Sequence, residues 1–182
     1  MVEILNKFVK NPYDFENCFY LGYEYEKIKH CSSAISFYLK AAEGTNDTDL
    51  AYECLLRIAE CYDTQGNREV HVISNLQWAI SILPNRPEAY YKLSRIYEVS
   101  GNWKECMVYS RIGMGCYEAG KLLVHIDVKQ YMLKFQYAYS LYSCGNFNKS
   151  LKMFKELSLD ANVSSYFKKI INNNIISISN VE

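Results

Sequence analysis

The strongest constraint in this sequence is a repeat of similar segments that are rich in tyrosine and phenylalanine. Each segment carries a small residue on its first predicted helix, and these residues follow one another at separations of 37, 35 and 44 positions: Gly22, Ala59, Ser94 and Ala138. Self-similarity at a period of roughly 20–50 residues is typical of stacked repeat architectures. We therefore predict a core built from units that bury their apolar faces on one another.

The repeated unit is predicted to be a pair of antiparallel helices. Only 8 Gly and 3 Pro occur among 182 residues, so few positions interrupt regular structure. A Gly-Asn pair follows the first predicted helix of three units, at 66–67, 101–102 and 145–146, and Gly readily adopts the left-handed conformation that ends a helix. Small side chains are needed where helices cross closely, and the predicted crossing residues are Gly22, Ala34, Ala59, Ala79 and Ala138.

The first unit resembles the tetratricopeptide family. It carries the family's order of large, small and aromatic residues at the family's separations, through Leu21, Gly22, Tyr25, Ala34, Tyr38 and Ala41. The other three units match this order more loosely. The resemblance implies an all-α, tetratricopeptide-like right-handed solenoid of antiparallel helix pairs with a C-terminal capping helix.

The repeats are predicted to form one domain that covers residues 1–182. They have approximate bounds of 12–45, 47–84, 86–116 and 127–160. The longest separation places a non-repeat excursion at 115–126, after which Asp127 and Gln130 have the spacing of a capping box. A capping helix is predicted at about 162–175. The IISIS segment that follows alternates as a strand would, but it is too short to found a sheet.

A larger part of the chain is similar to the helical repeat region found beside the catalytic domain of many family-2 glycosyltransferases. The similarity lies in the run from 57 to 103, in LLVH at 122–125 and in the segment 138–154. Asp47-Thr48-Asp49 matches the DxD pattern of such enzymes, but it stands between two predicted helices, where acidic residues cap a helix start. We expect no catalytic domain, no cofactor and no metal in this chain.

Charge and cysteine content disfavour several classes of partner. Twenty Lys and Arg balance twenty Asp and Glu, for a net charge of 0, so no global field favours nucleic acid. No apolar run approaches the length of about 20 residues that spans a membrane. Seven cysteines form an odd set with no CxxC pair, which indicates a reduced, cytoplasmic location.

The resemblance to tetratricopeptide proteins implies that the first helix of each unit lines a ligand-binding groove. We predict a non-catalytic scaffold that binds a protein or peptide there, through Glu16, Phe19, Tyr23, Glu53, Glu60, Asp63, Tyr91, Arg95 and Tyr139. Seven acidic residues against Lys27 and Arg95 leave a formal charge of −5 on this face, so a basic ligand is favoured. The acidic residues are Glu16, Glu26, Glu53, Glu60, Asp63, Glu88 and Glu98.

Three other interpretations stay open from the sequence. The chain could be an accessory or severed part of a family-2 glycosyltransferase that helps to bind a glycan acceptor or to assemble the enzyme. It could instead be a self-assembling module, because residues 1–102 carry a charge of −4 and residues 103–182 a charge of +4. The chain is expected to be a monomer or a weak homo-oligomer. Finally, the charged residues of the groove could be a solvated helix face whose aromatic residues only pack on neighbours.

Overall fold

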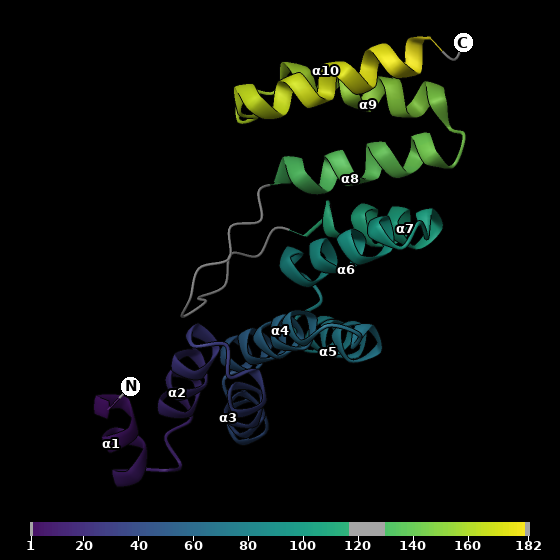
Figure 1. Ribbon diagram of the computed structural model, residues 1–182. Helices are drawn as coiled ribbons and strands as arrows, with labels where there is room; N and C mark the ends of the chain where they lie inside the picture. The colour runs from purple at the N-terminus through teal and green to yellow at the C-terminus, as the bar shows by residue number, and fades with distance from the viewer. Residues whose placement is uncertain (1, 117–129, 181–182) are drawn as a thin grey trace. The chain divides into compact units, whose positions relative to one another are not determined.

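The computed structural model describes residues 2–116 and 130–180, and all regular structure within these ranges is α-helical (Figure 1). The described helices are α1 (Val2–Lys10), α2 (Phe15–Lys27), α3 (Cys31–Gly44), α4 (Thr48–Gln65), α5 (Glu69–Ile82), α6 (Pro87–Val99), α7 (Trp103–Gly113), α8 (Gln130–Ser143), α9 (Phe147–Leu159) and α10 (Ser165–Ser179). The predicted all-α class is confirmed for this part of the chain.

The helices pack as sequential pairs. Helices α2 and α3, α4 and α5, and α8 and α9 lie against each other, while α1 packs on α2 and α10 packs on α9 (Figure 1). Helices α6 and α7 are in contact through Tyr97 and Tyr109, whose rings stack with centroids 5.4 Å apart. The described chain divides into two compact units, a first unit of residues 2–89 and a second unit of residues 90–116 and 130–180.

Small residues lie where helices cross, as predicted. Ala34, Ala59, Ala79 and Ala138 have at most 1% of their surface exposed. The tightest predicted crossing is at Gly22, where an added Cβ would lie 2.9 Å from Cδ1 of Tyr38 and 3.2 Å from the carbonyl oxygen of Ala34. Helix α2 can therefore approach α3 this closely only without a side chain at position 22.

The predicted Gly-Asn turns end the first helix of three pairs. Gly66, Gly101 and Gly145 have φ angles of +72°, +74° and +79°, which glycine adopts without steric cost. In the first pair Lys29 takes this place with a φ of +61°. An L-residue with a side chain adopts this conformation at a cost of roughly 1–2 kcal/mol. Asn67 in the second turn also has a positive φ, of +54°, but asparagine tolerates this region better than lysine does.

Side-chain caps mark the starts of α2, α4 and α10. Asp47 accepts hydrogen bonds from the N–H groups of Asp49 (2.9 Å) and Leu50 (3.2 Å) at the start of α4. The DxD match therefore includes a helix cap, as predicted. Helix α2 is capped by Asp14, which accepts from Asn17 N–H at 3.1 Å, so this helix begins three residues after the predicted start of the first repeat at 12.

The ends of the chain depart furthest from the sequence prediction. Helix α1 was not predicted at all. Helix α10 continues through the alternating IISIS segment, because Ile171 and Ile178, seven residues apart on one helical face, are both buried. Most of the predicted excursion at 115–126, together with the predicted helix start at Asp127, lies outside the described residues.

The close approach of α2 and α3 at Gly22 predicts how a larger residue there affects stability. We expect Gly22→Ala to destabilise the protein by about 1–3 kcal/mol although alanine is the better helix former, because the new Cβ overlaps the Tyr38 ring. Urea unfolding followed by circular dichroism measures the change. Gly115→Ala is the control, since a Cβ there meets only the Ile112 carbonyl oxygen at 3.4 Å. A Gly22→Ala variant as stable as the control would contradict the close crossing.

Candidate functional site

Six of the nine predicted groove residues lie in the first unit, and the structure separates them into surface and interior. Glu16 and Asp63 are exposed, and Tyr23 and Glu60 are half-buried. Phe19 and Glu53 are fully buried, which corrects the prediction that their side chains face a ligand. Both are placed on the first helix of a pair, so periodicity alone did not distinguish them from their exposed neighbours.

An arginine that the sequence analysis missed organises this region. Arg57 on α4 has a side chain that is only 9% exposed, and its Nη1 lies 3.2 Å from Oε1 of Glu26 and 3.8 Å from Oε2 of Glu60. The Tyr38 hydroxyl donates a hydrogen bond to the other Glu26 oxygen at 2.5 Å. We call Glu26, Tyr38 and Arg57 the Arg57 network. It ties α2, α3 and α4 together through charge-assisted hydrogen bonds.

The Arg57 network also holds Tyr23. The Arg57 guanidinium lies 5.4 Å from the centre of the Tyr23 ring, and the Lys27 ammonium lies 5.3 Å from it. Cations at this distance are attracted by the ring's electrons. Tyr23 is therefore already engaged by two cations of its own chain, which reduces its capacity to bind a cationic ligand.

A second buried arginine, also missed, fixes the start of α6 to α4. Arg86 is 2% exposed and donates to both carboxylate oxygens of Glu88, at 2.7 and 3.2 Å, and to Asp49 at 3.0 Å. The Tyr52 hydroxyl donates to Glu88 at 3.2 Å and accepts from the N–H of Ala89 at 3.1 Å. Every one of these polar groups has a partner, so the cluster is structural.

These pairings change the electrostatics that were predicted for the groove. Of the seven acidic residues counted, Glu26 and Glu60 pair with Arg57, Glu88 pairs with Arg86, Glu98 pairs with Arg95, and Glu53 is buried. The count of −5 omitted Arg57 and Arg86 because they lie outside the inward positions of the repeat pattern. The count from the sequence therefore overestimates the negative charge of this face. Of the seven acidic residues, only Glu16 and Asp63 are exposed.

Burial shifts the ionisation of several groups. Burial, followed by the hydrogen bond to Glu26, raises the pKa of Tyr38 well above its ordinary value. Burial also raises the pKa of the Cys61 and Cys106 thiols to about 12. The thiolate is the reactive form of cysteine, so neither thiol is suited to act as a nucleophile.

The second unit presents an aromatic surface. Phe135, Tyr139 and Tyr142 are half-buried residues at helical spacing on α8, and Trp103 of α7 meets Tyr139 edge-to-face with a centroid distance of 5.5 Å. Phe135 and Tyr139 lie parallel at 6.3 Å, and Tyr139 and Tyr142 are also 6.3 Å apart. We call these four residues the α8 row.

The two remaining predicted groove residues of the second unit lie on α6. Tyr91 is half-buried, and Arg95 is exposed and pairs with Glu98. The ion pair occupies Arg95 before any ligand binds. Tyr139 makes ring contacts with Trp103, Phe135 and Tyr142, so it is the predicted groove residue at the centre of a cluster of half-buried aromatic side chains.

The described residues contain no group of three or more His, Cys, Asp or Glu that could hold a metal ion. Across the two described ranges, every helix is too short or too polar to cross a membrane.

No family model and no curated protein matches the sequence. Solved structures do match the fold. A crystal structure of MamA, a tetratricopeptide-repeat protein, superposes with a TM-score of 0.65 at 18% identity, covering 85% of this chain and 82% of that one. A second crystal structure of MamA gives a TM-score of 0.61 at 18% identity, covering 82% and 74%.

The fold is tetratricopeptide-like. At 18% identity the similarity shows the fold alone, and it does not assign a ligand. The similarity to the repeat region of family-2 glycosyltransferases gains no support from these structures and stays a prediction from sequence.

Two arginines in different surroundings provide a matched prediction. We expect Arg86→Met to lower the free energy of unfolding by about 3–5 kcal/mol, because it leaves the Glu88 carboxylate buried without its partner. Arg95→Met removes an ion pair with a side chain that is 48% exposed and should cost no more than about 1 kcal/mol. Chemical denaturation of both variants measures the difference. Equal effects would show that burial does not govern the Arg86 pair.

The raised pKa of Tyr38 predicts a pH dependence. Folded Tyr38 keeps its proton at a pH where the unfolded chain loses it, so its stabilising contribution is complete below about pH 10 and is lost as the pH rises further. We expect the stability difference between wild type and Tyr38→Phe to decrease by about 1.4 kcal/mol per pH unit above pH 10. Unfolding titrations from pH 8 to 11.5 measure it, and parallel curves would contradict the prediction.

Proposed function

We propose that this chain is a non-catalytic scaffold that binds a segment of another protein on the α8 row. The proposal is carried by one observation, namely that three half-buried aromatic side chains contact the ring of Tyr139, which is itself only half-buried. Aromatic residues of this kind supply most of the binding energy at protein interfaces. The tetratricopeptide-like fold, which offers successive helix faces to a ligand, supports the same function.

The α8 row is held in place before any ligand arrives. Phe135 packs edge-to-face on Phe154 at 5.5 Å and on Phe167 at 5.0 Å, and Tyr142 packs on Phe147 at 5.6 Å. Side chains fixed in this way lose little conformational entropy on binding. Their remaining exposed surface can therefore contribute most of its contact energy to a ligand.

The surroundings of the α8 row favour apolar anchoring over attraction of a basic ligand. The described residues of the second unit carry ten Lys and Arg against four Asp and Glu, a net charge of +6. We propose a ligand segment that packs an aromatic or aliphatic side chain on the exposed surface of these rings. The predicted preference for a basic ligand would have to come from the first unit, where Glu26, Glu60 and Glu88 are already paired with buried arginines.

The other functions predicted from the sequence are weaker proposals. A glycan acceptor could also stack on tyrosine rings, and self-assembly could use the opposite charges of the two units, −5 over residues 2–89 and +6 over the described part of the second. No contact among the described residues favours either of them over a protein ligand.

Peptide selection tests the α8 row. We expect peptides selected from a random library on the wild-type protein to bind Tyr139→Ala at least tenfold more weakly, because truncation of a central aromatic anchor removes about 2 kcal/mol or more. Tyr166→Ala is the matched control, since Tyr166 is 72% exposed on α10 of the same unit. Fluorescence anisotropy gives the affinities. Peptides that bind both variants as they bind wild type would exclude the α8 row.

A further inference from the structure

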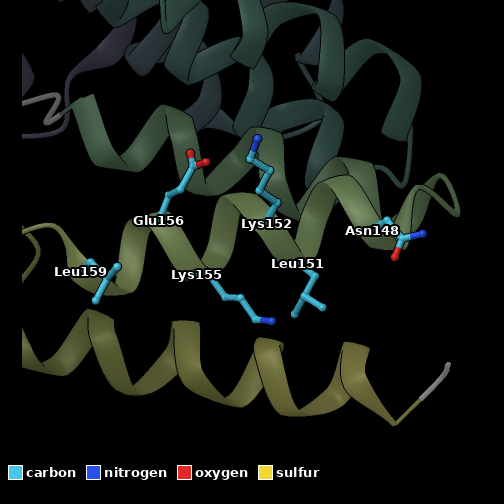
Figure 2. Close-up of a pocket in the computed structure, with 6 residues that line it drawn as sticks. All are labelled: Asn148, Leu151, Lys152, Lys155, Glu156 and Leu159. Carbon is cyan, nitrogen blue, oxygen red and sulfur yellow. The ribbon is translucent and has the colours of Figure 1, made fainter.

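A second surface of the second unit combines a groove, exposed leucine and unpaired lysines. The outer face of α9 bears a groove of about 380 Å³ that is lined by Asn148, Leu151, Lys152, Lys155, Glu156 and Leu159. Figure 2 shows these six side chains along one helix, with Leu151 and Lys155 pointing toward α10 and with Lys152 and Glu156 pointing away from it. We call this surface the α9 groove. It shares no residue with the α8 row.

The spacing of the lining residues fits a helical occupant. Asn148, Lys152, Lys155 and Leu159 follow at separations of four, three and four residues, which is the seam spacing of two helices packed side by side. The seam covers eleven steps along α9, or about 17 Å. Leu159 at its end is 84% exposed, so its apolar surface is available to a partner helix.

The charges of the α9 groove select an acidic occupant. The side chains of Lys152 and Lys155 form no ion pair with any residue in the described ranges. Lys149, one turn earlier, donates instead to the Tyr137 hydroxyl at 3.1 Å. Helix α9 therefore carries three lysines against Glu156 alone, on a unit that is itself positively charged. Lysines at the centre of a helical seam are complemented by carboxylates.

We propose that the α9 groove binds an acidic amphipathic helix of a partner protein. Leucine-sized side chains of that helix contact Leu151 and Leu159, and its Glu or Asp residues at the centre of the seam pair with Lys152 and Lys155. A flat anionic membrane is a poorer match, because it cannot fill a groove and because Glu156 lies among the lysines. This binding is independent of the α8 row and of the function proposed for it.

A designed peptide tests the α9 groove. The probe is a hydrocarbon-stapled, fluorescein-labelled helix of about 15 residues, with Leu at both ends of its seam and Glu at the centre. We expect Lys152→Glu/Lys155→Glu to weaken binding at least tenfold, and added NaCl to weaken the wild-type complex. The matched control Lys104→Glu/Lys169→Glu reverses two exposed lysines elsewhere in the unit and should change affinity less than twofold.

Two further variants separate the parts of the proposal. Leu159→Ser should weaken the peptide at least threefold, whereas Val108→Ser, which alters another exposed apolar residue on α7, should leave it unchanged. Tyr139→Ala should also leave it unchanged, which distinguishes this surface from the α8 row. Equal losses in the control pair, no binding by wild type, or preferential binding of phosphatidylserine vesicles through the same lysines would each overturn the proposal.

Discussion

The close contact of α2 with α3 is the constraint on which the first unit depends. At Gly22 the two helices lie so near that a single added carbon would meet the Tyr38 ring at 2.9 Å. The same ring ends in a hydroxyl that donates to Glu26, which in turn binds Arg57 of α4. A small residue at one position therefore sets the approach of two helices and brings the third into hydrogen-bonding range.

The fold could be predicted from sequence because its signals are local and repeated. Small residues at 22, 59, 79 and 138 and positive φ angles at 66, 101 and 145 each require a particular residue type within one helix or turn. The α10 boundary could not be predicted in this way. The IISIS segment alternates, and only burial of Ile178 against the rest of the second unit decides that it is helical.

The candidate site was predicted less well, for a physical reason. A helical pattern gives the face on which a residue stands, but it does not say which charges will find partners on neighbouring helices. Arg57 and Arg86 lie outside the predicted inner face. Together they form ion pairs with Glu26, Glu60 and Glu88. Tyr139 stays a predicted binding residue, and its neighbours Phe135 and Tyr142, four residues before it and three after it, lie on the same helix.

The two units differ in how their charged and aromatic side chains are used. In the first unit the buried arginines Arg57 and Arg86 pair with Glu26, Glu60, Asp49 and Glu88, so these charges stabilise the fold. In the second unit, the half-buried rings on α8 pack on the core with part of their surface and keep the rest exposed, and Lys152 and Lys155 on α9 are exposed. Interaction surfaces consist of such groups, since a side chain already paired inside the protein must give up that partner before it can bind another. The aromatic row on α8 and the groove on α9 share no residue, so a substitution in one of them tests its proposed ligand without altering the other.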